Sequence, residues 1–173
     1  MTNFSSENIP LPIELGVTNS LKESGILQFY RSSNTTPTIP LIVNSTTTQL
    51  LPANSFNLIS STLGQILFKT GNTAIIKKTA TYIHNITIHV YSNEGTVGIV
   101  AMDMINAYGG TVRPNALATK NITEFSIEPL ELKFVHQHTA GDEVQLRFGG
   151  GIVPGGSNLQ LNFVDIQWLI TET

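Results

Sequence analysis

Two stretches decide the fold class: EVQLRF at residues 143–148 and LQLNFVDIQWLI at residues 159–170, joined by a loop with five glycines. In the first stretch Val, Leu and Phe alternate with Glu, Gln and Arg, which is the period of a strand with one buried face. In the second stretch the apolar positions change phase near Phe163 and Val164. That change predicts either a β-bulge or a strand with apolar neighbours on both faces. The sequence therefore predicts a long-looped hairpin in which residues 159–170 form a central strand.

The same strand pattern extends over much of the chain. Strands are expected at residues 65–69, 73–77, 82–91, 96–105, 125–129 and 130–134. Pro129 is expected to end one of these strands, and residues 106–120, with two glycines and a proline, are expected to form a long loop. No stretch keeps a helical period over a dozen residues. The chain is therefore predicted to be an all-β antiparallel sandwich.

Residues 96–105 are apolar on both phases of the predicted strand. A strand with two dry faces needs cover on both sides, and we expect a neighbouring subunit to supply part of that cover. The same argument applies to the terminal strand, because its apolar residues occupy both phases. The predicted subunit interface consists of Val97, Ile99, Val100, Met102, Met104, Ile166 and Trp168.

Residues 1–40 are rich in proline and polar spacers and carry only two basic residues, Lys22 and Arg31. Proline fixes its own φ and disfavours helix in the residue before it, so this segment is predicted to be an extended arm, with room for a short strand at residues 26–30. Such an arm could tether the chain to other particle proteins, lie across a neighbouring subunit or form a flexible leader. Residues 41–173 then form the sandwich domain.

Composition restricts the class of partner. Charged residues make up 12% of the chain, and the formal net charge is −3. Nucleic-acid binding needs clustered Lys and Arg, so nucleic acid is not expected as a partner. The chain contains no cysteine, and neither a signal peptide nor a membrane-spanning apolar run is visible. A surface rich in Ser, Thr and Asn is frequent in extracellular and virion β-proteins.

Motifs for catalysis are absent from the sequence: it has no H-E-x-x-H, no G-x-S-x-G and no Walker loop. No enzyme activity and no cofactor are therefore expected. His136 and His138 are two residues apart and would project to one side of a strand, which makes them weak candidates for metal ligands. Ordinary strand-end histidines are the favoured interpretation. Tyr108 and Arg113 lie in the predicted loop and are candidates for contact with a receptor or glycan.

Short motifs complete the sequence pattern. Ala80-Thr81-Tyr82 precedes a long strand, and Ala140-Gly141-Asp142-Glu143-Val144 opens the penultimate one. This order resembles the C1q/TNF-like jelly-roll family, in which a Gly or Ala two residues before a Tyr opens a core strand and a Gly-Asp pair opens the penultimate strand. Its bacterial and phage versions, including the C-terminal domain of a spore-surface collagen-like glycoprotein, are particularly similar. The resemblance covers about residues 56–170.

The resemblance implies a ten-strand sandwich that assembles as a compact trimer with an apolar threefold axis. With the composition, it leads us to expect a non-enzymatic, homotrimeric virion or particle-surface protein for decoration or host attachment. A single jelly-roll capsid protein that forms a small icosahedral shell is the second choice, although capsid arms are often more basic than residues 1–40. A bacterial spore or cell-surface C1q-like domain is the third.

Overall fold

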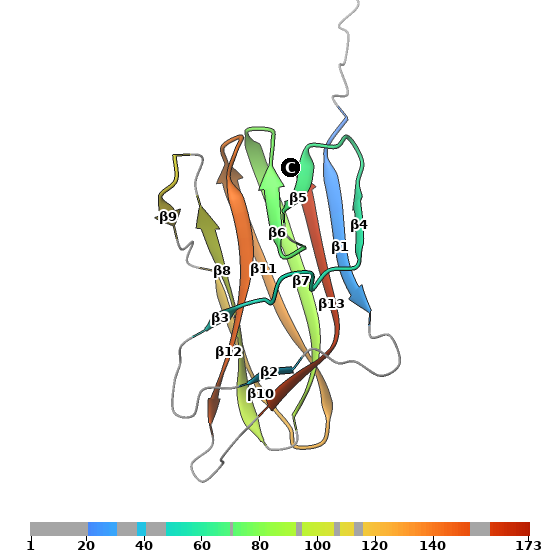
Figure 1. Cartoon of the computed structure of the whole chain (residues 1–173), viewed down its shortest axis with the longest axis vertical. Coiled ribbons are helices and arrows are strands. Elements are labelled where there is room, and N and C mark those ends of the chain that lie inside the picture. The colour runs from blue at the N-terminus through green and yellow to red at the C-terminus, as the bar shows by residue number, and fades with distance from the viewer. Residues whose placement is uncertain are drawn as a thin grey trace, which may run out of the picture.

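Two antiparallel sheets packed face to face make up the computed structural model, which describes residues 21–30, 38–40, 48–69, 71–92, 95–105, 108–112, 116–152 and 160–173 (Figure 1). Sheet A runs in the order β11-β7-β13-β1-β4, with β2 also paired to β13. Its strands are β1 (Ser24–Tyr30), β2 (Thr38–Pro40), β4 (Leu58–Ser61), β7 (Ala80–Ser92), β11 (Ile127–His138) and β13 (Gln160–Glu172). Sheet B runs in the order β10-β8-β12-β6-β5, with β3 on β12 and β9 on β8. Its strands are β3 (Gln49–Leu50), β5 (Ile66–Lys69), β6 (Thr73–Ile76), β8 (Thr96–Ile105), β9 (Thr111–Val112), β10 (Leu117–Ile122) and β12 (Glu143–Ile152).

The all-β prediction is confirmed, and the strands predicted at residues 65–69 and 73–77 correspond to β5 and β6, which pair antiparallel. The predicted hairpin between the two C-terminal runs is wrong. β12 pairs with β8, β6 and β3 in sheet B, whereas β13 pairs with β7, β1 and β2 in sheet A. The two strands supply apolar faces to one core from opposite sheets, which the same alternation allows.

β13 is central in sheet A, as predicted, because it lies between β7 and β1. Its register against β7 shifts between Phe163 and Asp165, so of the two predicted alternatives the structure has the bulge. The bulge leaves Val164 as the extra residue. Phe163 on one side of it and Ile166 on the other therefore both face the core, where both are buried.

Pro129 does not end a strand, contrary to the prediction. It lies inside β11 and stands opposite His89 of β7. β11 is the edge strand of sheet A and has a partner strand on one side alone. On its other side there is no strand to accept a hydrogen bond, so a proline, which has no N–H, is tolerated there. The predicted loop 106–120 is likewise interrupted, since β9 and the start of β10 fall within it.

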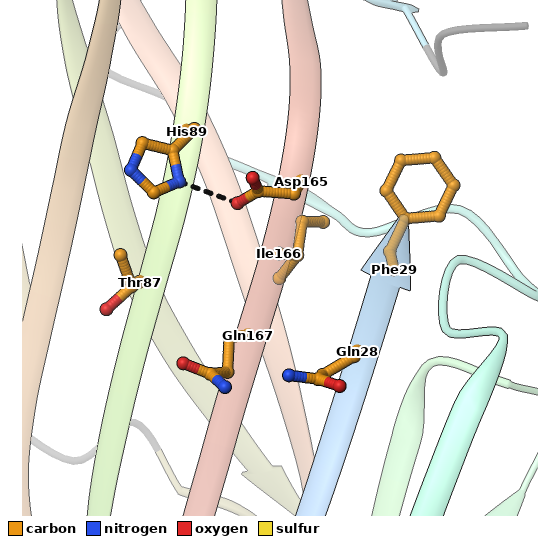
Figure 2. A pocket seen from close by; sticks show the side chains of 7 residues that line it. All are labelled: Gln28, Phe29, Thr87, His89, Asp165, Ile166 and Gln167. Atoms are coloured by element: carbon orange, nitrogen blue, oxygen red, sulfur yellow. Dashed lines mark hydrogen bonds and ion pairs between the residues drawn. The ribbon is translucent and has the colours of Figure 1, made fainter. Parts of the chain in front are cut away.

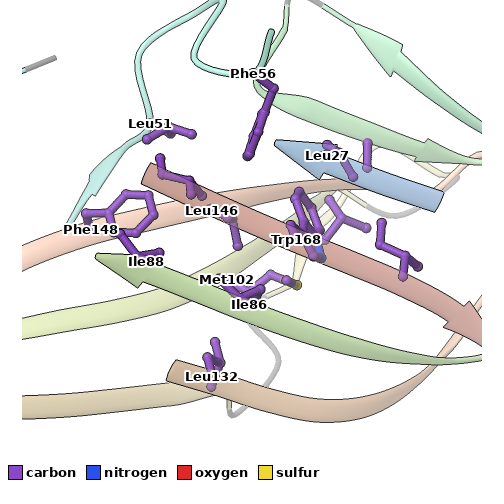
Figure 3. Close-up of a cluster of buried hydrophobic side chains, with 14 of the residues drawn as sticks. Leu27, Leu51, Phe56, Ile86, Ile88, Met102, Leu132, Leu146, Phe148 and Trp168 are labelled. Carbon is purple, nitrogen blue, oxygen red and sulfur yellow. The ribbon is translucent and has the colours of Figure 1, made fainter. Parts of the chain in front are cut away.

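The core of the described residues fills the space between the sheets of one chain (Figure 3). Trp168 is fully buried at its centre, and the Phe56 ring lies 6.2 Å from it between centroids. Large apolar side chains from sheet B, among them Leu146 and Phe148, oppose Ile86 of sheet A. Each such side chain contributes about 1.5–3 kcal/mol on burial. In the described part of the chain, no helix has the length and apolar character needed to cross a membrane.

The predicted boundary between an arm and a domain at residue 40 is wrong for the residues that the structure describes. β1 lies inside sheet A between β13 and β4, and Leu27 is fully buried. A Cβ at Gly25 would lie 2.8 Å from Cδ1 of Ile66, so β1 also approaches sheet B closely. Residues 1–20 and 31–37 lie outside the described residues, and the extended arm stays a prediction there.

Candidate interaction surface

The outer face of sheet A presents an apolar strip across four strands. Along β7 the even-numbered side chains point into the core and the odd-numbered ones point away from it. Val135 of β11 stands opposite Ile83 of β7, and Leu169 of β13 stands opposite Ile26 of β1. Ile83 and Leu169 are diagonal neighbours on the same face. These four residues form the outer strip, in which Val135 is 59% exposed and the other three are half-buried.

A hollow of about 210 Å³, lined by both polar and apolar side chains, lies next to the outer strip on the same face (Figure 2). Its lining consists of Gln28, Phe29, Thr87, His89, Asp165, Ile166 and Gln167. Nδ1 of His89 lies 2.6 Å from Oδ1 of Asp165, and the two side chains are 39% and 41% exposed. The bulge in β13 places Asp165 opposite His89. The hollow therefore offers an imidazole–carboxylate pair, two amides and a hydroxyl, a set suited to hydrogen bonds with a polar partner.

The weak metal candidates lie in a buried histidine cluster. His138 is 1% exposed, and its Nε2 lies 2.9 Å from Nε2 of His84. The other nitrogen of His138, Nδ1, lies 3.3 Å from Oδ2 of Asp142, and the His136 ring is 4.8 Å from the His138 ring between centroids. On the other side of His84, the Nε1–H of Trp168 donates to Nδ1 at 3.1 Å.

These contacts do not suit a metal ion. Indole nitrogen is only a donor, so Nδ1 of His84 must accept and its proton must be on Nε2. That proton occupies the nitrogen through which His84 would bind a metal, and it also points at Nε2 of His138. Consistent with this, the described residues contain no group of three or more His, Cys, Asp or Glu side chains arranged to hold a metal ion.

The residues predicted for a subunit interface are placed differently by the structure. Met102, Ile166 and Trp168 belong to the buried core of the single chain, and Met104 is buried as well. They have no surface to offer to a neighbour, so they are removed from the predicted interface. Val97 is half-buried, and the side chains of Ile99 and Val100 lie outside the described residues.

The predicted recognition residue Tyr108 is 91% exposed, just before β9. Its neighbours Gly109 and Gly110 are exposed as well. Arg113, the other residue predicted for this loop, lies outside the described residues. Contact with a receptor or glycan through Tyr108 stays a prediction.

Sequence reasoning missed both histidine contacts. His84 occupies the same phase of β7 as Ile86 and Ile88, and that signal alone could have predicted its burial. Its partners come from strands far away in the chain, so no local pattern identifies them. The pair of His89 and Asp165 depends in addition on the position of the bulge.

No protein-family model matches this chain, and no curated protein matches it by sequence. Solved structures match its fold over most of its length. The chain is similar to Eiger TNF from S. frugiperda, with a TM-score of 0.57 and 8% identity over 86% of this chain and 91% of that chain. It is similar to murine APRIL at pH 5.0, with a TM-score of 0.55 and 8% identity over 87% and 99%.

A third similar structure is the globular domain of zebrafish complement 1qA protein, with a TM-score of 0.56 and 13% identity over 88% of this chain and 96% of that chain. At these identities the likeness concerns the fold. The fold is a C1q/TNF-like jelly roll, as the sequence predicted.

Proposed function

We propose that this chain is a non-enzymatic jelly-roll module that assembles as a homotrimer on the outside of a virion or comparable particle, for decoration or host attachment. The C1q/TNF-like fold supports a trimer, because the family resemblance implies that assembly. The low content of charged residues supports an extracellular or particle-surface setting.

The observation that carries the proposed assembly is the outer strip. Its four aliphatic side chains lie on a sheet face instead of in the core, and Val135 is more than half exposed. Lys133 and Gln167 on the same face are exposed, so the surface is apolar at its centre and polar around it. That arrangement is typical of protein–protein interfaces. We therefore place the subunit contact on the outer face of sheet A.

The test is the mass of the full chain in solution, measured by light scattering over a range of concentrations. A closed trimer has three times the 18.8 kDa of one chain. Val135→Lys places a charge in the outer strip and is expected to shift the protein to monomer while Trp168 fluorescence stays native. Leu117→Lys is the matched control, because Leu117 is 61% exposed on β10 of sheet B. This control is expected to remain trimeric.

Other outcomes discriminate among the alternatives. A folded monomer at high concentration would refute the trimer, and particles of many copies would favour the capsid shell. A trimer that withstands Val135→Lys but dissociates with Leu117→Lys would move the contact to sheet B. Electron microscopy of the particle that carries this chain, with labelled antibody, tests the proposed location.

A further inference from the structure

A directed series of hydrogen bonds runs through the buried histidine cluster. The indole N–H of Trp168 donates to Nδ1 of His84, and neutral His84 therefore carries its proton on Nε2. That N–H donates to Nε2 of His138, so neutral His138 carries its proton on Nδ1. This proton in turn faces Oδ2 of Asp142, which also accepts the backbone N–H of Thr139 at 2.8 Å. Each imidazole donates one hydrogen bond and accepts one, and neither nitrogen is left over.

The series joins the two sheets at one end of the sandwich. Trp168, His84 and His138 come from three neighbouring strands of sheet A: β13, β7 and β11. Asp142 belongs to the turn between β11 and β12, where the chain passes from sheet A to sheet B. The N–H of Gly141 donates to the carbonyl of Ile76 at 2.7 Å, which fastens this turn to β6 of sheet B.

We propose that the series Trp168–His84–His138–Asp142 is an acid-sensitive clasp, which holds the β11–β12 turn against the core while both imidazoles are neutral and releases it when either imidazole takes up a second proton. A second proton on His84 must go to Nδ1, where it meets the N–H of Trp168. A second proton on His138 must go to Nε2, where it meets the N–H of His84. In both cases a buried hydrogen bond becomes a contact between two donors, which the fold cannot satisfy without movement.

The surroundings of the two imidazoles favour their neutral forms. Burial lowers the pKa of His84 well below its usual value, and the neighbouring His138 and His136 add to that shift. Burial also lowers the pKa of His138 to about 4, His136 acts in the same direction, and the hydrogen bond to Asp142 opposes it.

The remaining groups that pack against the cluster carry no compensating charge. The Phe134 ring of β11 stacks on His84 at 4.6 Å, and the Tyr82 ring of β7 is 5.8 Å from His138. Burial, with the charges of Glu172 and Glu23, raises the pKa of Tyr82 to about 12, so Tyr82 stays neutral in acid. Among the described residues, Asp142 is the one carboxylate within hydrogen-bond distance of His84 or His138.

The direction of the pH effect follows from linkage. In the unfolded chain His84 and His138 each bind a second proton near pH 6.5, whereas in the folded chain they bind it only at lower pH. Stability is therefore fully present above about pH 6.5 and is lost as the pH falls toward 4. For His138 alone, with a folded pKa of about 4, the unfolding equilibrium constant is expected to rise roughly 20-fold between pH 7 and pH 5.

The first experiment uses the wild-type chain, so it does not depend on whether a variant folds. Long-range ¹⁵N NMR of the imidazoles is expected to show His84 as the Nε2–H tautomer and His138 as the Nδ1–H tautomer, both neutral at pH 5. Amide hydrogen exchange, corrected for the intrinsic pH dependence, is expected to lose more protection at Gly141 than at Phe56, whose N–H donates to Gly71 in a distant turn.

The second experiment is urea denaturation at pH 7 and pH 5 at one protein concentration. The variant His84→Gln/His138→Gln keeps hydrogen-bonding groups but cannot titrate, and it is expected to lose most of the pH dependence. His89→Gln, in the exposed pair with Asp165, is the matched control and is expected to keep it.

Three results would overturn the proposal. One is a second proton bound by His84 or His138 near pH 6.5 with the fold intact. Another is an unfolding constant at pH 5 within 3-fold of its value at pH 7. Equal loss of protection at Gly141 and Phe56 would show that acid does not act at this end of the sandwich.

Discussion

Replacing Leu27 with alanine tests whether β1 is a structural strand of the sandwich or part of a dispensable arm. Leu27 is 0% exposed, and it stands opposite Trp168 in the register of β1 and β13. Truncating a fully buried leucine removes its transfer free energy and leaves a cavity, which costs about 2–5 kcal/mol. For a chain of this size each kcal/mol lowers the melting temperature by about 2–4 °C, so a loss near 3 kcal/mol corresponds to roughly 6–12 °C.

The assay is urea denaturation followed by fluorescence of Trp168, the single tryptophan of the chain. All samples are compared at one protein concentration, because any assembly would add to the apparent stability. Leu21→Ala is the matched control, since Leu21 is 74% exposed and its loss is expected to cost less than about 0.5 kcal/mol. If Leu27→Ala also costs less than 1 kcal/mol, then β1 does not contribute to the core and the placement of residues 24–30 in sheet A is refuted.

Two further pairs of substitutions each compare the same residue type at a crowded or buried site and at an open or exposed site. Gly71 and Gly64 both have φ +71°, but a Cβ at Gly71 would lie 2.6 Å from Cα of Asn54, whereas nothing lies within 4 Å at Gly64. Gly64→Ala is therefore expected to cost about 1 kcal/mol and Gly71→Ala clearly more in the same denaturation assay, and equal losses would contradict the close approach. Asp142→Asn is expected to cost about 1–3 kcal/mol at pH 7 because a buried acceptor is weakened, while Asp165→Asn in the exposed pair is expected to cost less than about 1 kcal/mol. A larger loss at Asp165 would contradict that ranking.

The period-two pattern predicted which side chains of each strand face the core but not which strand lies beside which. Val144 and Leu146 alternate with polar residues as they would in either sheet, and that is why β12 and β13 were expected to pair although they face one another across the core. Pro129 predicts a strand end because its missing N–H is tolerated only at a sheet edge, and whether a strand lies at an edge is a property of the whole sheet. The four prolines of residues 1–40 predict an extended arm with a short strand at residues 26–30, and only long-range pairing shows that β1 belongs to sheet A.

The candidate sites were predicted less well than the fold, for a related reason. His136 and His138 were identified as a pair from their spacing, but the contact that defines the cluster joins His138 to His84, 54 residues earlier in the chain. Trp168 was assigned to an interface on its hydrophobicity, yet its N–H needs a buried acceptor, and His84 supplies it. A pattern along the chain carries no information on such a match between donor and acceptor across strands.

Because one chain buries most of its apolar strand residues by itself, a subunit contact would have to cover only the outer strip. The sequence predicts a trimer partly from an apolar excess that one sandwich would not bury, but Met102, Met104 and Trp168 are buried within the single chain. In the proposed trimer, folding and assembly therefore involve different residues. The outer strip is short and lies beside the hollow that holds His89 and Asp165, and mixed surfaces of this kind form weaker interfaces than the apolar ones of obligate oligomers. A charge at Val135 should thus dissociate the subunits and leave each one folded, whereas a cavity at Leu27 should destabilise every subunit whether or not it is assembled.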